Sequence, residues 1–117
     1  MAVWWQNAAR DEREAVLRIP SIGERITGDE RARALAGALT HECREALIET
    51  LFASGADLLI LPIQDLFGWS DRINQPATVN GANWTWKLPW PSDRLSTEPE
   101  AMAIAAQLRE WAQRHGR

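Results

Sequence analysis

Seven residues in the second half of the chain, six of them polar or aromatic, are the most suited to contact a ligand. They are Gln64, Asp65, Asn74, Gln75, Pro76, Trp84 and Trp86. The first two directly follow a short aliphatic run, and the others lie in the long polar stretch behind it. Places where a strand opens into a long loop often carry ligand contacts. Tryptophan faces also stack well against the apolar faces of sugar rings, so the region predicts a binding site.

The element that positions these residues is the aliphatic run Leu58–Leu61. A continuous aliphatic run predicts a strand buried on both faces, as in a parallel sheet covered by helices. From Pro62 to Ser96 no periodicity predicts a regular element, and a loop of that length in a compact domain is usually functional or disordered.

Four helices are predicted from apolar spacing and end signals. Asn7 is the expected cap of a helix over residues 8–18, and Thr27 or Asp29 that of a helix over 29–38. Thr40 should cap a helix over 41–53, with Gly55 at its end. A capping box at Thr97-Glu98-Pro99-Glu100 should begin a last helix over 98–114.

Length and composition limit the class of protein. The 117 residues are sufficient for one domain, so the chain is expected to form a single segment, 1–117. The net charge of −3 argues against nucleic-acid and anionic-membrane partners. The single cysteine, Cys43, cannot form an internal disulfide and fits a reducing compartment. Without an export signal or a membrane-spanning apolar run, the expected location is the cytoplasm.

The predicted strand has no obvious neighbour in the chain. A buried strand needs partners for its backbone N–H and C=O groups, and Trp84–Leu88 is at best a short edge candidate. The expected fold is therefore mainly α with one short parallel-type strand. Either another chain completes the strand, or the sequence is part of a larger unit.

Three motifs, in order, identify the larger unit. Pro62-Ile63-Gln64-Asp65, Asn74-Gln75-Pro76-Ala77-Thr78 and Asn83-Trp84-Thr85-Trp86-Lys87 resemble the C-terminal end of the 4-α-glucanotransferases. These enzymes, also called amylomaltases or disproportionating enzymes, are (β/α)₈ TIM barrels of glycoside hydrolase family seventy-seven. Weaker similarity extends back to Trp4-Trp5.

The resemblance implies a C-terminal fragment of a barrel enzyme that transfers α-1,4-glucan segments between maltooligosaccharides. Such enzymes are retaining and need two carboxyl groups about 5 Å apart. In the family these lie upstream of the matched region, so the resemblance assigns no catalytic residue to this chain and predicts that it is inactive alone. No cofactor and no metal site are expected. Ala77 stands where the family has glycine, which puts the turn there in question.

The resemblance also implies that the seven residues border a sugar site. For Gln64 and Asp65 the alternative is a local role, with Asp65 capping the following turn. For Asn74, Gln75 and Pro76 the alternative is a turn. The spacing of two places Trp84 and Trp86 on opposite sides of an extended segment, so at most one can stack on a sugar.

Two other function classes remain open. The chain could be a non-catalytic glucan-binding module that uses the tryptophan-rich loop. It could also be a helical interaction protein that forms a homo-oligomer, or that pairs with a separate barrel remainder. The unpaired strand and the apolar helix faces favour association, with Leu59 and Leu61 as the expected contacts.

Overall fold

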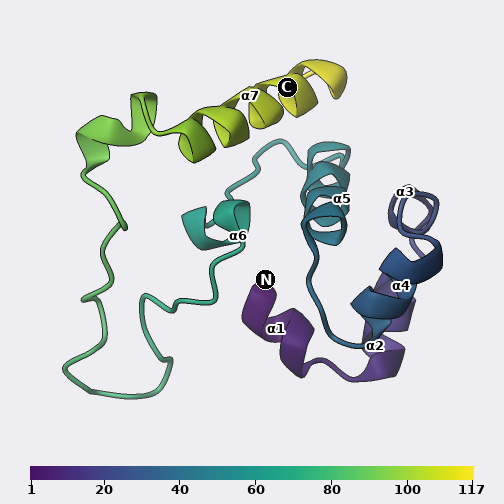
Figure 1. Ribbon diagram of the computed structural model, residues 1–117, viewed down its shortest axis with the longest axis horizontal. Helices are drawn as coiled ribbons and strands as arrows, with labels where there is room; N and C mark the ends of the chain where they lie inside the picture. Colours follow the sequence, from purple (N-terminus) through teal and green to yellow (C-terminus); the bar gives the residue numbers. More distant parts are fainter.

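A computed structural model describes all residues, 1–117, and contains helices but no strand. The order of elements along the chain is α1 Ala2–Asn7, α2 Arg10–Val16, α3 Pro20–Gly23, α4 Gly28–Leu35, α5 His41–Phe52, α6 Ile63–Phe67, η1 Ser92–Ser96 and α7 Pro99–Arg114. In Figure 1, α2 to α4 lie to the right of and below α5, α1 lies below α6, and α7 runs above them. None of the helices is both long and apolar enough to cross a bilayer.

The predicted strand Leu58–Leu61 is wrong. The segment is irregular, and its backbone groups make no hydrogen bond to any other backbone group of the chain. A strand is defined by the ladder it forms with a neighbour, and neither Trp84–Leu88 nor any other segment provides one. The mainly α part of the predicted fold is confirmed.

The four predicted helices are present, with corrected ends. Thr40 caps α5 as predicted, because its hydroxyl accepts a hydrogen bond from the N–H of Cys43 at 3.2 Å. Asn7 is not the cap of the next helix; it ends α1, and its amide donates back to the carbonyl of Val3 at 2.7 Å. Helix α5 ends at Phe52, and its C-terminal cap is Ala53 rather than Gly55. Helix α7 begins after Glu98 with no side-chain cap.

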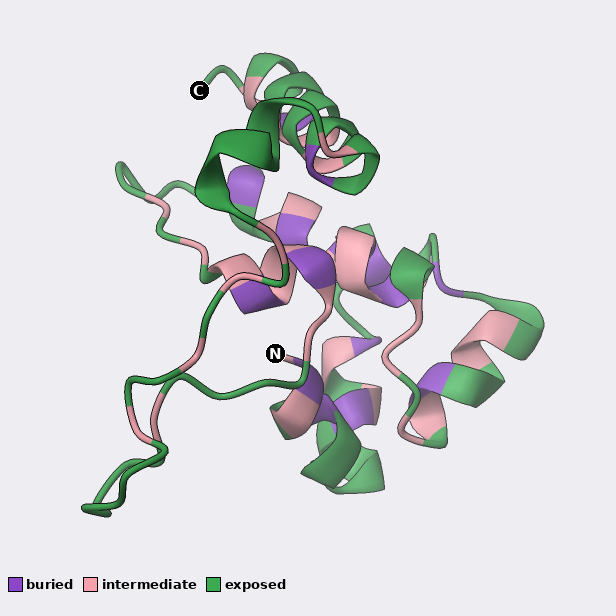
Figure 2. Ribbon diagram, turned by 60° about the vertical axis from the view of Figure 1, so that its left-hand side comes forward, coloured by how far each residue is buried: buried purple, intermediate pink, exposed green.

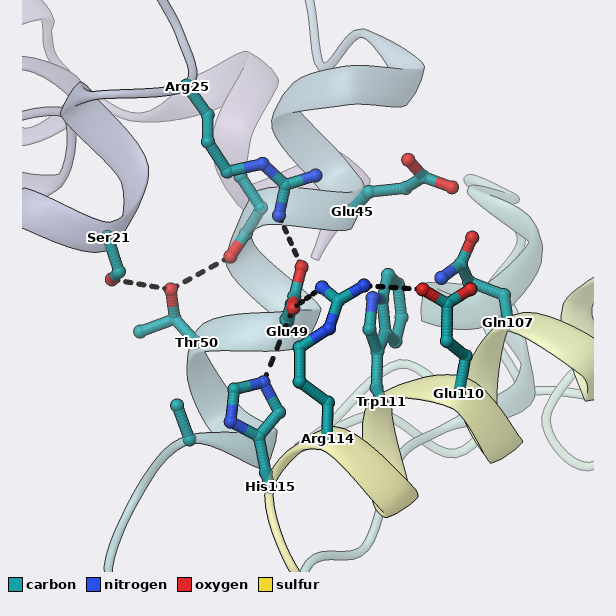
Figure 3. A pocket seen from close by; sticks show the side chains of 12 residues that line it. Ser21, Arg25, Glu45, Glu49, Thr50, Gln107, Glu110, Trp111, Arg114 and His115 are labelled. Atoms are coloured by element: carbon teal, nitrogen blue, oxygen red, sulfur yellow. Dashed lines mark hydrogen bonds and ion pairs between the residues drawn. The ribbon is translucent and has the colours of Figure 1, made fainter.

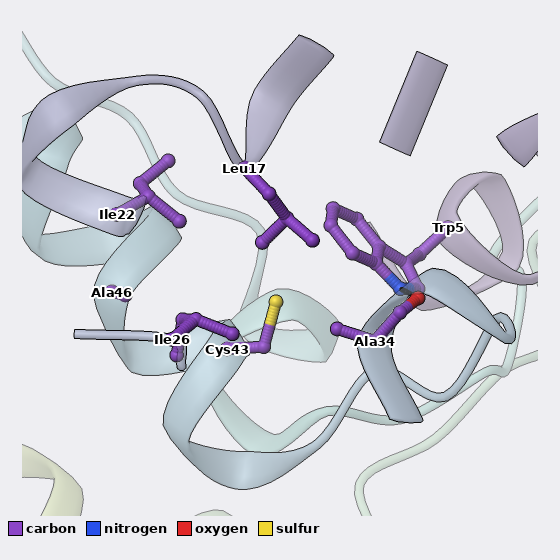
Figure 4. Packing of buried hydrophobic residues seen from close by; sticks show 7 residues of the cluster. All are labelled: Trp5, Leu17, Ile22, Ile26, Ala34, Cys43 and Ala46. Atoms are coloured by element: carbon purple, nitrogen blue, oxygen red, sulfur yellow. Dashed lines mark hydrogen bonds between the residues drawn. The ribbon is translucent and has the colours of Figure 1, made fainter. Parts of the chain in front are cut away.

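The first hydrophobic core joins α1 to α5. It contains seven buried side chains, shown in Figure 4: Trp5, Leu17, Ile22, Ile26, Ala34, Cys43 and Ala46. The indole N–H of Trp5 donates to the carbonyl of Ala34 at 3.2 Å, so α1 is fixed to α4 by a hydrogen bond as well as by packing. Burial raises the pKa of the Cys43 thiol to about 11, with the charge of Glu30 adding to it.

The buried side chain of Arg13 links α1 and α4 by hydrogen bonds. Its side chain is only 9% exposed, and the guanidinium donates to three carbonyls, those of Trp5 at 3.0 Å, Ala8 at 2.7 Å and Leu35 at 3.1 Å. These carbonyls lie near the ends of α1 and α4, where backbone acceptors lack helical partners. A buried cation therefore completes the hydrogen bonding of two helix ends.

A second and smaller core lies between α5 and α7. Ile48, Phe52 and Trp111 are buried there, with Leu59, Leu61, Leu66 and Leu108 packed around them. Arg117 closes its edge by donating to the carbonyls of Phe52, Ser54 and Ala56. Beyond this core, the long segment between α6 and α7 is almost entirely exposed or half-buried (Figure 2).

Candidate functional site

The short helix α6 was not predicted, and it carries two of the predicted site residues. Pro62 precedes it with φ −61°, a value suited to entering a helix, and Gly68 ends it with φ +71°. Glycine adopts that left-handed conformation without penalty. A Cβ at Gly68 would also overlap the Arg44 guanidinium, so the position favours glycine. Gln64 and Asp65 are held on the single turn between these two ends.

A pocket of about 380 Å³ lies between α1 and the segment from Pro62 to Pro76. Gln64, Asp65, Asn74 and Pro76 all line it, so the structure brings together four of the seven predicted residues. Trp4, Trp69, Asp71 and Arg72 line it as well. The pocket size is within the range of small-ligand sites, about 300–1,000 Å³.

Gln64 and Asp65 differ in how their side chains are satisfied. The Asp65 carboxylate forms an ion pair with the ammonium group of Met1, a contact far along the chain rather than a local cap. The Gln64 side chain is 7% exposed, and its Nε2 atom is buried without a hydrogen-bond partner in the chain. Leaving a buried polar group unpaired costs about 1–3 kcal/mol, so a polar group from elsewhere would stabilise this site.

The loop that contains Asn74, Gln75 and Pro76 is closed at its base. The N–H of Trp84 donates to the carbonyl of Ile73 at 2.7 Å. Within the loop, the Asn83 side-chain oxygen accepts from the N–H of Gln75 at 2.8 Å, and its amide donates to the carbonyl of Thr78 at 2.9 Å. Gln75 therefore contributes its backbone to the loop, while its side chain is exposed and does not line the pocket.

Ala77 has φ +59°. This left-handed conformation costs an L-residue roughly 1–2 kcal/mol, and glycine adopts it freely. The turn at Ala77, where the resembling family has glycine, therefore holds the alanine in a conformation better suited to glycine.

Trp84 and Trp86 lie apart from the pocket. Trp84 is 75% exposed, with a left-handed φ of +66°, whereas Trp86 is half-buried against Trp69, with ring centroids 5.7 Å apart. Trp69 in turn stacks on Phe67 at 4.4 Å, and Trp90 packs edge-on against both rings. Trp86 thus belongs to an aromatic cluster that supports the loop, and only Trp84 has a free face.

The sequence did not single out Trp4, Trp69, Asp71 or Arg72 as site residues. The pattern gave no reason to expect a helix at Ala2–Asn7, so nothing indicated where Trp4 would point. Trp69, Asp71 and Arg72 lie in the stretch from Pro62 to Ser96, where no periodicity indicated which side chains would converge. Once α1 is known, the pair is informative: neighbouring residues on a helix point about 100° apart, so with Trp5 at the centre of the core Trp4 lies toward its edge.

A second, larger pocket of about 500 Å³ lies where α3, α5 and α7 meet (Figure 3). Glu49 is at its centre and accepts from Arg25 at 2.6 Å and from Arg114, with His115 Nε2 at 3.3 Å. Arg114 also pairs with Glu110. One carboxylate of α5 therefore contacts charged groups from two other places: the C-terminal end of α7 and Arg25, which follows α3.

The pKa of Glu49 is lowered by this arrangement. Burial alone would raise it, but the hydrogen bonds from Arg114 and His115, with the charges of Arg114 and Arg25, outweigh that effect. A carboxylate held ionised by several partners is a poor general acid. The arrangement therefore serves to hold α7 against the rest of the chain and does not indicate a catalytic group.

Comparison with known proteins gives a family match and two clear relatives. The model of the family described as 4-alpha-glucanotransferase matches residues 1–93. The chain is 29% identical over 103 residues to the chloroplastic/amyloplastic 4-alpha-glucanotransferase of Arabidopsis thaliana, covering 85% of this chain and 15% of that protein. It is 30% identical over 118 residues to the chloroplastic/amyloplastic enzyme of Solanum tuberosum, covering 97% of this chain and 17% of that protein. No solved structure matches.

Proposed function

This chain belongs to the 4-alpha-glucanotransferase family, and from that premise we propose that it forms one wall of a glucan site in a retaining transferase. It spans only 15% to 17% of the length of the two relatives. In this proposal residues 1–117 correspond to the C-terminal part of a catalytic barrel. The substrate is an α-1,4-glucan or maltooligosaccharide, and the remaining barrel supplies the chemistry.

The segment Asp57–Leu61 is the observation that carries the proposal. Leu59 and Leu61 pack inward on the second core, whereas Leu58 and Ile60 point outward and are 74% and 79% exposed. This alternation has the period of a strand, and the backbone groups of the segment have no backbone partners. The segment therefore has the features of a strand whose neighbours come from another part of the enzyme.

The overall size supports the same proposal. The radius of gyration is 15.7 Å, whereas a compact domain of this length would have about 13 Å. Only 16 of 117 residues are buried. A chain that buries so little against itself has apolar surface available for the rest of a larger domain.

The chemistry requires groups beyond the pocket. Retaining transfer uses a carboxylate nucleophile and a carboxyl acid/base about 5–5.5 Å apart. The pocket beside α6 has two carboxylates: Asp65, which is ion-paired with the Met1 ammonium, and Asp71, which is next to Arg72 in the chain. The other polar groups are the occluded Gln64 amide and the Asn74 side chain. We assign the pocket to sugar binding and expect the catalytic pair from the rest of the enzyme. The seven proposed binding residues divide accordingly: Gln64, Asp65, Asn74 and Pro76 line the pocket, Trp84 offers a free face, and Gln75 and Trp86 hold the loop.

A segment exchange tests the proposal. The matching segment of the Solanum tuberosum enzyme is replaced by residues 1–117 of this chain, and glucose release from maltotriose is measured. We expect transfer activity in the chimaera, none in a version that lacks the segment, and none in the isolated chain. A stable chimaera without activity would contradict the proposal. So would glucose release by the isolated chain that is lost in Asp65→Asn, because the chemistry would then reside in this chain.

A second candidate function is self-association, favoured by the exposed Leu58 and Ile60. Two copies could pair these segments and remove apolar area worth about 25 cal/mol per Å². The sequence pointed to Leu59 and Leu61, but these side chains pack inward, so Leu58→Lys and Ile60→Lys are the appropriate variants. Sedimentation equilibrium of the isolated chain decides: a dimer that both variants weaken supports this function, and a monomer excludes it.

The cytoplasmic location and the glucan-binding module stay predictions. Both named relatives are chloroplastic or amyloplastic proteins, so the location of this chain is tested by imaging a tagged copy in its own cell. A module function would require the isolated chain to bind glucan, which titration with maltotriose measures.

A further inference from the structure

The pocket beside α6 has an aromatic wall that comes from the opposite end of the chain. Trp4 lies on α1 and lines the pocket, whereas the residues facing it belong to α6 and the following loop. Its side chain is 48% exposed. An indole with half of its surface in water gains free energy when a ligand covers that surface.

Trp5 determines where Trp4 points. Trp5 is wholly buried and is hydrogen-bonded to Ala34 in the first core (Figure 4). The two indoles meet edge-on, with centroids 6.0 Å apart and planes at 67°. Because Trp5 anchors α1, the helix cannot turn Trp4 into the core, and the Trp4 ring stays at the rim of the pocket.

Gln64 gives an independent indication of a ligand. Its side chain is nine-tenths buried and lines the pocket, and the amide makes no hydrogen bond within the chain. An amide carries both donors and acceptors. A ligand with hydroxyl groups would satisfy it, whereas an apolar ligand would leave it unpaired.

The charge balance narrows the class of ligand. Asp71 and Arg72 line the pocket with opposite charges, and Asp65 is paired with the Met1 ammonium. In the isolated chain neither sign of charge is in excess, so the pocket lining does not select an anion or a cation. An indole wall beside amides and balanced charges suits a neutral molecule that has an apolar face and a rim of hydroxyls, which describes a pyranose ring.

We propose that Trp4 stacks on one pyranose ring of the glucan and that the Gln64 amide hydrogen-bonds a hydroxyl of the same ring. This subsite rests on the proposed function, because it assigns a sugar to the same pocket. The proposal adds Trp4 as a binding residue. It also assigns to Gln64 a hydrogen bond to a sugar hydroxyl, whereas Asp65 is already ion-paired.

Titration of the isolated chain with maltotriose, followed by nuclear magnetic resonance, tests the subsite. We expect the indole N–H signal of Trp4 and the side-chain amide signals of Gln64 to shift together with one dissociation constant. The indole signal of Trp111, which is buried in the second core outside the pocket, should not move. Shifts confined to Trp84 or Trp86, or no shifts at saturating maltotriose, would overturn the proposal.

Variants separate a contact from a structural role. Trp4→Ala should weaken binding about tenfold, Trp4→Phe less, and Gln64→Met should weaken it while leaving the Trp4 ring in place. The matched control Gln113→Met, at an exposed position on α7 outside the pocket, should bind as the parent does. If Trp4→Ala fails to fold by circular dichroism, Trp4→Phe and the direct shifts still decide. Unchanged binding in folded Trp4→Ala would refute the stacking contact.

The two proposals can fail separately. An inactive chimaera, together with maltotriose binding through Trp4, would refute the transferase role and keep the subsite. An active chimaera in which the isolated chain shows no shifts would keep the transferase role and refute the subsite.

Discussion

The helices α1 to α5 and the segment from Ala53 to Glu98 place their apolar residues in opposite ways. The first region turns Trp5, Leu17 and Ile26 into one core and completes its helix ends with buried Arg13. The second leaves Leu58, Ile60 and Trp84 in water and holds its loop mainly with backbone and amide hydrogen bonds. The difference shows which part of the chain can order itself and which part has apolar surface left for a partner.

Hydrogen exchange should show the largest difference between the two regions. Amides of α5 from Ala46 to Phe52 are hydrogen-bonded within a packed helix, so they should exchange about a thousandfold or more slowly than in an unfolded chain. Amides of Leu58 to Leu61 have no backbone partners and should exchange near the unfolded rate. Strong protection at Leu59 in a dilute sample would contradict this contrast and indicate that copies of the chain pair there.

Trp5→Ala should cause the largest loss of stability among single substitutions. It empties a fully buried site and removes the indole donor to the Ala34 carbonyl, which keeps the N–H of Gly37 as its other donor. We therefore expect a loss of about 3–5 kcal/mol in the free energy of unfolding. Trp84→Ala, at a 75% exposed position, serves as the control and should change stability by about 0.5 kcal/mol or less. Urea unfolding measures both, and equal losses would show that the two regions fold as one.

Arg13→Met should cost somewhat less. The methionine keeps much of the packing volume but leaves the carbonyls of Trp5, Ala8 and Leu35 without the guanidinium donor. We expect a loss of about 2–3 kcal/mol, typical for hydrogen bonds to a charged group. Arg18→Met is the matched control, since Arg18 pairs only with Glu14 at an exposed position. A loss in Arg13→Met no greater than in the control would show that water replaces the guanidinium.

Glu49→Gln should lower stability only above acid pH. The pKa of Glu49 is lower in the folded chain than in the unfolded chain. As pH falls through the usual carboxyl range, the unfolded chain therefore takes up a proton before the folded chain does. The stabilisation by Glu49 is fully present at neutral pH and is lost as pH falls through the pKa of the folded chain. We expect a difference of about 1 kcal/mol at neutral pH, since the partners Arg114 and Arg25 are about half exposed. Thermal unfolding from pH 7 downward should show the parent and variant converging; a constant difference would contradict the ion-pair origin.

Ala77→Gly should have the smallest effect. Relief of the left-handed φ at +59° and the entropy that glycine loses on folding oppose each other, leaving a gain of about 0.5 kcal/mol. Ala82→Gly in the same loop is the control, because Ala82 has no positive φ to relieve and should lose stability. Melting temperatures of both variants test this, and a loss at Ala77 equal to that at Ala82 would show that the strain is not felt.

The parts of the fold that local signals determine were predictable. Thr40 and the apolar spacing behind it predicted a helix over 41–53, and α5 is His41–Phe52. The strand prediction failed because an aliphatic run specifies an extended segment but cannot provide its neighbour. Helices α1, α3 and α6 were missed since each has one or two turns, too short for a periodic pattern, and depends on packing for stability.

For the candidate site, the sequence predicted positions along the chain but not their convergence. Gln64, Asp65, Asn74 and Pro76 were expected near a ligand, and the structure brings them to one pocket. Trp4 was not expected there, because its position depends on how Trp5 enters a core that is distant in sequence. Trp84 is exposed and Trp86 is half-buried. Trp84 lies in a turn with a left-handed φ, so the extended segment on which the prediction of opposite sides rested is not formed there.

The hydrogen bond from the Trp84 N–H to the Ile73 carbonyl affects which changes in loop length the chain can tolerate during evolution. Because it closes the loop at its base, insertions or deletions between these residues need not displace the aromatic cluster behind them. Doubling the length of such a loop adds only about 0.6 kcal/mol of closure entropy. Descendants of this sequence can therefore gain or lose loop residues while the helices that support the loop keep their places.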